Sequence, residues 1–412
     1  LSIVIFLIII AETLGVWFVN TQLIIPANRL NAAMWVFQFA IASFVMNLLS
    51  VPFNSIIIAH EKMNIYAIVG LVEVLSKLLL TYCIANIHFD KLEVYAVLMF
   101  VMTFSISMFY GILGVWKFKE CRIRMCWYPE IFKEIMGYSG WSLFGALSGV
   151  FRSQGINILL NIYFNPIVNA ARAIAYQINS AINQFVLNFF KAVQPQITKY
   201  YAASEIQELH KLIYRSSRYC FFLILLLSLP LLFEMPSILS IWLKEVPEYT
   251  VLFSRLVILI AIIDSTAYPL QTAITATGRI KKYQIVTGGL LIMNLPLSWF
   301  FLKIGFPPEV TMYVALCIAI ISQVSRIVFS NKQVGMSLRS YYSYVLISMV
   351  KVCLPTVVLG VFIHLIFSGT TLGAFISMAL IVFVSLIIIV IVGMTTNERL
   401  MLKNVIIKKI KR

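Results

Sequence analysis

The sequence predicts an all-α, polytopic bundle of membrane helices, and its composition, its segment lengths and its lack of alternation support this fold class. Of its 412 residues, 61% are hydrophobic and 12% are charged, whereas soluble domains carry about 25% charged residues. Apolar segments of ~20 residues, the length that crosses the hydrocarbon core, recur along the chain. They do not alternate between polar and apolar residues as barrel strands do, so the backbone is expected to satisfy its hydrogen bonds within helices.

Charged residues, prolines and glycines divide the chain into twelve predicted helices. Their expected limits are 1–20, 31–58, 63–85, 91–116, 138–162, 166–192, 213–233, 250–277, 282–303, 309–330, 342–366 and 372–395. We expect four domain-level segments. These are a first lobe over 1–116, a basic linker over 117–137, a six-helix second lobe over 138–335, and two trailing helices with a basic tail over 336–412.

The distribution of Lys and Arg predicts the orientation, because these residues are retained on the cytoplasmic side of a membrane. Alternate loops and the C-terminal tail hold most of the 32 basic residues, including Arg279 and Arg326, so the tail is expected in the cytoplasm. The net charge of +16 is spread over all these loops. We therefore expect anionic membrane lipids as partners and no nucleic acid.

An internal repeat relates two helix junctions, VPFNSIIIAHEKMNIYAIV and YPLQTAITATGRIKKYQIV. Equal spacings separate a proline, a basic residue and a tyrosine in both, namely Pro52, Lys62 and Tyr66 against Pro269, Arg279 and Tyr283. In this repeat the helices 138–162 and 166–192 have no counterparts, so we expect two further helices before Leu1. The first lobe then holds four of six helices, and an axis along the membrane normal relates two six-helix lobes around a central cleft.

The predicted helix 166–192 carries one polar stripe. Asn169, Arg172, Tyr176, Ser180 and Asn183 recur at steps of three and four, with Gln177 beside them, so they share a face of the helix. Lipid does not tolerate such a face. It either lines a wet cavity or forms an interhelical seam of hydrogen bonds.

The preceding helix adds Arg152, Gln154 and Asn157 at about mid-membrane. Arg152 and Arg172 can together hold a phosphate or pyrophosphate, because a guanidinium group stays protonated and binds paired oxygens. The alternative is that these arginines form buried ion pairs with Asp264 or Glu12.

Acidic residues within spans are candidate sites for ion coupling. Glu73 stands four residues before Lys77 and can neutralise it, which we favour over proton coupling. Asp264 and Glu12 have no local partner, so each is a candidate cation or proton site. Arg255 lies nearer a span end and is expected to extend toward the membrane surface.

No enzyme, cofactor or metal signature is found in the sequence. It lacks a phosphate-binding loop, an HExxH motif and a nucleophile elbow. Cys121 and Cys126 are the only two cysteines in one expected loop, and their spacing does not match the zinc-ligand pattern. We therefore expect neither an enzyme nor a bound metal.

Three stretches resemble polysaccharide flippases of the Wzx type, and more specifically the lipopolysaccharide-biosynthesis flippases of Bacteroides-like bacteria. They are VPFNSIIIAHEKMNIYAIV, GINILLNIYFNPIVNAARAIAYQINSAINQFVLNFFKAVQPQITKYYA and TATGRIKKYQIV. The superfamily also contains multidrug and toxin extruders and lipid II flippases. The resemblance implies two six-helix lobes around a cationic cavity in the bacterial inner membrane. It also implies transfer of undecaprenyl-diphosphate-linked oligosaccharide to the outer leaflet by alternating access, with Arg172 binding the diphosphate.

Two other functions stay open at this point. An ion-coupled multidrug extruder of the same superfamily is expected to line its cavity with acidic residues, and Arg152 and Arg172 argue against it. A polysaccharide polymerase or ligase is expected to carry a large periplasmic loop, whereas the longest expected outer loop, EMPSILSIWLKEVPEYT, is short. A flippase implies the lipid-linked oligosaccharide as partner, and a polymerase and glycosyltransferases as candidate neighbours.

Overall fold

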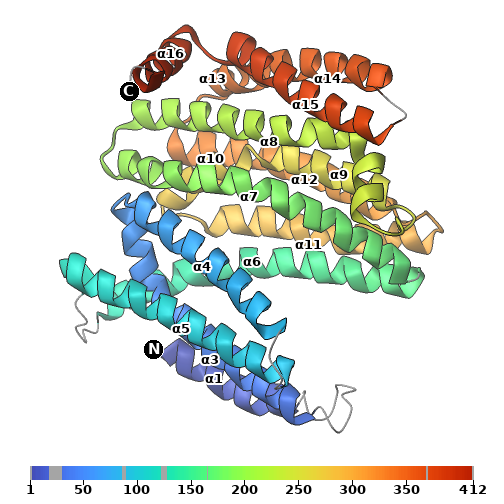
Figure 1. Ribbon diagram of the computed structural model, residues 1–412. Coiled ribbons are helices and arrows are strands. Elements are labelled where there is room, and N and C mark those ends of the chain that lie inside the picture. The colour runs from blue at the N-terminus through green and yellow to red at the C-terminus, as the bar shows by residue number, and fades with distance from the viewer. Residues whose placement is uncertain are drawn as a thin grey trace. The chain divides into compact units, whose positions relative to one another are not determined.

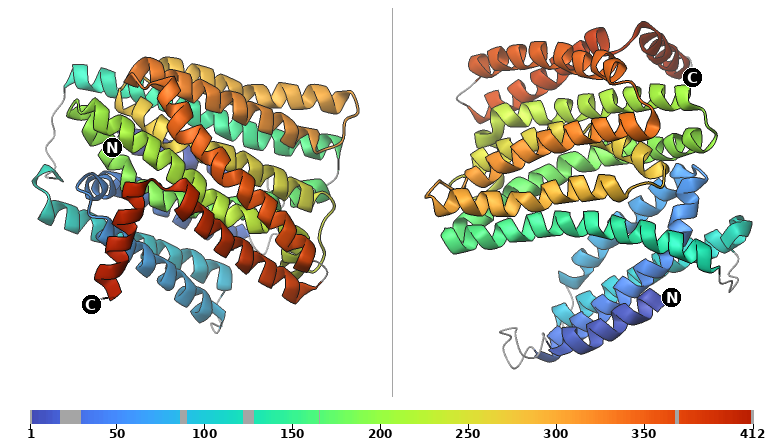
Figure 2. Two further views of the ribbon diagram at one scale, coloured as in Figure 1. Left: turned by 90° about the horizontal axis from the view of Figure 1, so that it is seen from above. Right: turned by 180° about the vertical axis from the view of Figure 1, so that it is seen from behind.

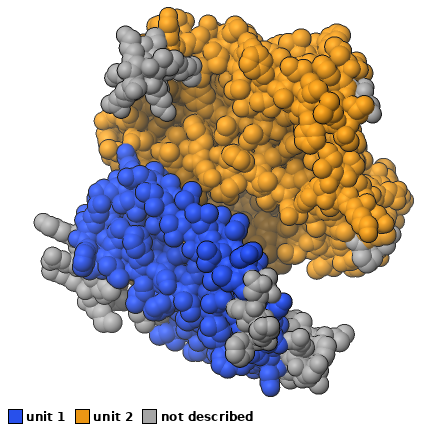
Figure 3. Space-filling view, in the orientation of Figure 1, with its two compact units in different colours: residues 1–126 blue, residues 127–412 orange. Residues whose placement is uncertain are grey.

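The computed structural model describes residues 2–17, 30–85, 90–121, 128–164, 166–367 and 370–410, and these residues form helices and contain no strand. The fold class is therefore all-α, as the sequence predicts. The chain divides into two compact units, residues 1–126 and 127–412 (Figure 3). The expected end of the first helix at 18–20, part of the basic linker, Cys126 and the last two residues lie outside the described residues.

Unit 1 contains the first four predicted helices. It consists of α1 (Ser2–Ile10) continued by the π-helix η1 (Ala11–Gly15), α3 (Leu30–Ala59), α4 (Met63–Ala85), α5 (Lys91–Lys117) and the short 3₁₀-helix η3 (Lys119–Cys121). Helices α3 and α5 lie side by side (Figures 1 and 2). A cluster of buried side chains, Ile57, Val69, Tyr110 and Phe118, joins α3, α4 and the end of α5.

Unit 2 contains the remaining helices, which stack in layers in Figures 1 and 2. In chain order they are α6 (Pro129–Tyr163), α7 (Pro166–Ala202), α8 (Ile206–Trp242), α9 (Thr250–Asp264), α10 (Ala267–Ala276), α11 (Lys281–Lys303), α12 (Val310–Val334), α13 (Leu338–Tyr341), η4 (Tyr342–Leu346), α14 (Ile347–Phe367), α15 (Thr371–Ile388), η5 (Ile389–Gly393) and α16 (Thr396–Ile410). Helix α6 packs on α11, and α14 and α15 pack on α8.

Eight helices in the described part of the chain are long and apolar enough to cross a membrane, or nine if the bent pair α9 and α10 forms one span. The protein is therefore a multi-pass membrane protein. Helices α6 and α7, predicted to be spans, are not among the eight, because polar residues are distributed along both. The predicted continuous helix 250–277 is wrong in one respect, since it bends by 43° between α9 and α10.

Glycines bring α6 and α11 into close contact. A Cβ atom at Gly288 would lie 2.8 Å from Cε1 of Phe144 and 2.9 Å from Oγ of Ser148. A Cβ atom at Gly155 would clash with the side chain of Leu295. Small residues are used in this way between membrane helices, because close packing is what holds such helices together.

Two prolines interrupt α8 near its end. Glu234 departs from helical geometry there, with φ −98° and ψ 19°, between Pro230 and Pro236. Pro236 has no N–H for the carbonyl of Leu232, and that oxygen instead accepts a hydrogen bond of 3.0 Å from Nε of Arg255. Arg255 of α9 therefore stabilises the kink in α8. It was predicted from the sequence to extend toward the membrane surface.

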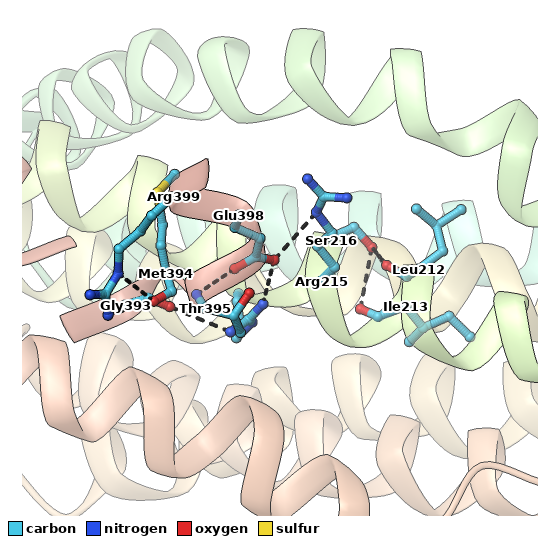
Figure 4. A network of polar contacts seen from close by, with 10 residues as sticks. Leu212, Ile213, Arg215, Ser216, Gly393, Met394, Thr395, Glu398 and Arg399 are labelled. Atoms are coloured by element: carbon cyan, nitrogen blue, oxygen red, sulfur yellow. Dashed lines mark hydrogen bonds and ion pairs between the residues drawn. The ribbon is translucent and has the colours of Figure 1, made fainter. Parts of the chain in front are cut away.

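The last helix, α16, is held to α8 through Glu398 (Figure 4). Its buried carboxylate lies 2.7 Å from Nη2 of Arg218 and accepts a 2.8 Å hydrogen bond from the N–H of Thr395. Burial alone would raise the pKa of Glu398. The Thr395 hydrogen bond and the Arg218 charge outweigh burial, so the pKa lies below its ordinary value.

The close contact at Gly288 predicts that leucine substitutions at two neighbouring glycines of α11 differ in their effect on stability. Gly288→Leu overpacks the contact with α6, which typically costs about 1–3 kcal/mol, so we expect a lower midpoint of thermal unfolding. Gly289→Leu is the control, because nothing lies within 4 Å of a Cβ atom at that position. Unfolding of the purified protein in detergent, followed by tryptophan fluorescence, distinguishes them. Equal midpoints for the two variants would show that the contact is unimportant.

The lowered pKa of Glu398 predicts acid-sensitive docking of α16. A carboxyl whose pKa is lowered by folding adds stability above its ordinary pKa, about 4.3, and loses it as the pH falls below that value. The protection of α16 amides, measured as the exchange rate relative to the intrinsic rate at the same pH, should therefore fall below about pH 4. In Glu398→Gln the protection should already be low at neutral pH, because breaking a buried pair costs about 3–5 kcal/mol.

Glu208→Gln serves as the control for that experiment. Glu208 pairs with Lys211 at 2.7 Å, but both side chains are exposed, and exposed pairs contribute about 0–1 kcal/mol. Unchanged exchange in Glu398→Gln at neutral pH would show that other contacts dock α16.

Candidate functional site

Helix α7 presents three faces that differ in exposure and polarity. Its buried face carries small and aliphatic residues such as Ala171, Ala175 and Val186. Gln177 and Ser180 lie on an exposed polar face. Arg172 lies at the boundary of these two faces, and the rest of the helix surface is apolar and exposed. The predicted polar stripe is therefore a continuous edge of α7 that begins inside unit 2 and becomes exposed.

Arg172 is the charged member of the stripe, and its side chain is buried, at 5% exposure. Its Nη1 atom donates a hydrogen bond to Oδ1 of Asn157 on α6. The guanidinium carbon lies 4.5 Å from the centre of the Tyr176 ring, a position in which the ring face attracts a cation. An amide and an aromatic ring thus hold the guanidinium group between α6 and α7.

Asn157 connects three other polar side chains, those of Arg172, Asn169 and Gln154. The side-chain Oδ1 of Asn157 accepts from Arg172, and the backbone oxygen of Asn157 accepts a 3.1 Å hydrogen bond from Nδ2 of Asn169. The Nδ2 atom of Asn157 donates to Oε1 of Gln154 at 3.1 Å. The structure therefore forms the interhelical seam that the sequence analysis left as one alternative. Gln154, at the end of this chain of hydrogen bonds, is exposed.

The seam has an excess of positive charge. Within the described ranges, no carboxylate forms an ion pair with Arg172 or Arg152, and Arg152 lies close enough to act on Arg172 with a charge of the same sign. Nε of Arg172 and Oδ1 of Asn169 are buried without a hydrogen-bond partner. A buried cation without an acidic partner is costly and marks a functional site.

The acidic partners proposed for these arginines are engaged elsewhere. Asp264 at the end of α9 forms a 3.0 Å ion pair with Arg326 of α12. Glu12 in η1 accepts a 3.0 Å hydrogen bond from Nε2 of Gln38. The alternative that these arginines pair with Asp264 is therefore wrong, because the carboxylate of Asp264 is bound to Arg326.

Asn183 belongs to a separate polar group. Its Nδ2 atom donates to Oδ1 of Asn179 at 2.7 Å, and Tyr268 of α10 donates to Asn183 at 3.5 Å. Although Asn183 lies on the same stripe of α7 as Arg172, its contacts join α7 to α10. They do not join α7 to α6.

Glu73 forms the predicted ion pair with Lys77, at 2.6 Å. The pair lines a cavity of about 450 Å³ among α3, α4 and α5, together with Asn47, Tyr95 and Thr103. The sequence analysis identified the pair from its spacing, but the cavity depends on packing between three helices and could not be foreseen.

The position of Arg326 differs from the prediction, which placed this residue among the charges of a loop. It lies inside α12, and its largely buried side chain contacts Asp264 and also Gln323, whose Nε2 donates to Oγ1 of Thr266 at 2.6 Å. The signal in the sequence is a polar pair three residues apart, Gln323 and Arg326, within an otherwise apolar run.

A buried carboxylate and histidine pair was missed altogether. Glu234, at the kink of α8, lies 2.7 Å from Nδ1 of His364 on α14, and the imidazole stacks on Phe233 with ring centres 5.9 Å apart. The sequence analysis placed Glu234 in an outer loop because α8 was expected to end at residue 233. The helix continues to Trp242, so Glu234 is buried within unit 2.

A comparison with family models, with curated proteins and with solved structures finds no match to this chain.

The unneutralised charge of Arg172 predicts opposite effects of two substitutions at one position. Asn157→Asp places a carboxylate beside the guanidinium group and should raise the unfolding midpoint, since a hydrogen bond to a charged partner contributes about 1.5–3 kcal/mol. Asn157→Leu has a similar size but removes the acceptor and should lower the midpoint. Thermal unfolding in detergent measures both. A lower midpoint for Asn157→Asp would indicate that another group already neutralises Arg172.

Proposed function

We propose that this protein is a flippase of the bacterial inner membrane that moves undecaprenyl-diphosphate-linked oligosaccharide from the inner to the outer leaflet by alternating access, with its C-terminal tail in the cytoplasm. The observation that carries the proposal is the buried Arg172, which is held by Asn157 and Tyr176 and has no carboxylate paired to it among the residues that the structure describes. A polysaccharide polymerase and glycosyltransferases are the expected neighbours of such a protein.

The chemistry of the seam fits a diphosphate better than a neutral ligand. Arg172 and Arg152 supply two positive charges, and a guanidinium group binds two phosphate oxygens at once. The binding of an anion would compensate the buried charge, which the surrounding amides only partly stabilise. The diphosphate is therefore assigned to Arg172 and Arg152, with Asn157 and Tyr176 holding Arg172 in place and Asn169 bound to the backbone oxygen of Asn157 beside them.

The exposed edge of α7 and α6 supports a sugar-bearing substrate. Gln177, Ser180 and Gln154 are exposed and carry neutral groups that both donate and accept hydrogen bonds. Sugar hydroxyls have the same dual capacity. An edge of amides and hydroxyls beside a cationic group is therefore suited to a phosphorylated oligosaccharide.

Export of cationic drugs is less well supported. Such a transporter needs accessible carboxylates, whereas Asp264 on α9 and Glu234 on α8 are engaged by Arg326 and His364. Asp264, Glu12 and Glu73 stay candidates for ion coupling, but proton binding at Asp264 or Glu73 would have to break an existing ion pair.

The proposal predicts that Arg172→Glu abolishes surface polysaccharide in cells that depend on this protein, while the protein level in the membrane stays unchanged. A negative charge in that position repels a diphosphate. Arg172→Lys keeps the charge but loses the two-pronged geometry, so it should restore polysaccharide only in part. Immunoblotting of the protein and staining of surface polysaccharide measure the two quantities.

Arg255→Gln is the matched control, because it removes a charge from another helix of unit 2. Arg255 donates a hydrogen bond to the backbone carbonyl of Leu232, and the amide group of a glutamine can also donate to that carbonyl. Polysaccharide should therefore be close to the wild-type amount. Wild-type polysaccharide in Arg172→Glu would remove Arg172 from the site.

A further inference from the structure

A groove of about 450 Å³ lies where α7, α8, α15 and α16 meet, away from the Arg172 seam. Most of its lining is apolar or aromatic. The residues that define it are Phe189, Tyr219, Phe222, Leu226, Leu386 and Ile389. Because α8 and α15 are both candidate membrane spans, this lining lies at a depth where hydrocarbon chains are found.

One end of the groove is charged. Arg215 and Glu398 both line it, but Glu398 is already bound by Arg218 at 2.7 Å, whereas Nε of Arg215 lies 3.4 Å away. Figure 4 shows the terminal nitrogens of Arg215 pointing away from Glu398. The side chain of Arg215 is 48% exposed, so its charge is available to a ligand.

The charges at this end sum to a positive value. Arg215 and Arg218 both lie beside a single carboxylate, Glu398, at 3.4 and 2.7 Å. One acidic group cannot neutralise two guanidinium groups, so the mouth of the groove attracts anions.

The groove also has the depth that an acyl chain requires. Arg215 and Leu226 line the same groove from one helix, and a rise of about 1.5 Å per residue separates them by roughly 16 Å along α8. The charged mouth lies at the end of the bundle that includes the basic tail, which the loop charges predict to face the cytoplasm. Cationic side chains above an apolar slot at that membrane surface match the two parts of a phospholipid.

We infer that this groove binds one anionic phospholipid of the cytoplasmic leaflet, with its phosphate at Arg215 and an acyl chain along Tyr219, Phe222 and Leu226. A guanidinium group and a phosphate form a strong charge-assisted hydrogen bond, and basic residues at this surface favour anionic over zwitterionic lipid. The bound lipid would span α8, α15 and α16 and so join the C-terminal helices to the body of unit 2.

Native mass spectrometry of the purified protein tests this inference with two lipids of equal chain length, phosphatidylglycerol and phosphatidylcholine. We expect retention of one phosphatidylglycerol molecule over phosphatidylcholine by about fivefold, the effect of one basic residue at an anionic surface. Arg215→Gln should reduce this preference to near unity, and Arg215→Lys should keep most of it. Leu226→Trp fills the slot without changing any charge and should lower retention of both lipids.

Lys332→Gln on α12 is the control, since Lys332 is also an exposed basic residue of unit 2 outside the groove. It should retain the preference of the unaltered protein. Full retention in Leu226→Trp, or equal losses in Arg215→Gln and Lys332→Gln, would overturn the inference in favour of diffuse attraction to the protein surface. Displacement of phosphatidylglycerol by equimolar undecaprenyl phosphate would overturn it in favour of a site for transported lipid.

Discussion

A positive charge buried between two helices, with amide and aromatic partners in place of an acid, is the constraint around which unit 2 is organised. Burying a guanidinium group costs several kcal/mol unless the surroundings compensate it, and Asn157 and Tyr176 supply only a neutral dipole and a ring face to Arg172. In the function that we propose, the diphosphate of the substrate would complete this arrangement. It would reach Arg172 along the exposed edge formed by Gln177 and Ser180.

The other charges within unit 2 show how the chain stabilises charge when no ligand is needed. Asp264 has Arg326, Glu234 has His364, and the carbonyl left open by Pro236 has Arg255. Each contact crosses between helices, so each also fixes how those helices pack, as expected in a medium that offers no competing water. Arg172 departs from this pattern, because within the described residues no carboxylate pairs with it, and this difference is why we propose that it binds a ligand.

The sequence predicts which segments are helices because hydrophobic length is a local property, although some ends are wrong, since α7 continues to Ala202 and was expected to end at residue 192. The expected ranges 63–85 and 91–116 differ from α4 and α5 by no more than one residue at either end. The spacing in the sequence was also sufficient to predict the ion pair between Glu73 and Lys77, since both residues lie on one helix. It could not identify Arg326 or His364 as partners of acids on other helices, because those contacts depend on how distant segments pack. The break between α9 and α10 and the extension of α8 past Glu234 were missed for the same reason.

The two cationic positions of unit 2 differ in the way that their proposed ligands differ. Arg172 is buried and positioned by hydrogen bonds to a neighbouring helix, so an anion there must enter from the exposed edge of α7 and can leave again, as a transported group must. Arg215 is half exposed above an apolar slot, and a lipid whose acyl chain lies in that slot gains hydrophobic contact along its length and so dissociates slowly. A cation at a polar edge favours rapid release of the bound anion, whereas a cation above an apolar groove favours long residence of a bound lipid. In these two proposals the same type of side chain would serve transport in one setting and anchoring in the other, because the surface beside it is polar in the first and apolar in the second.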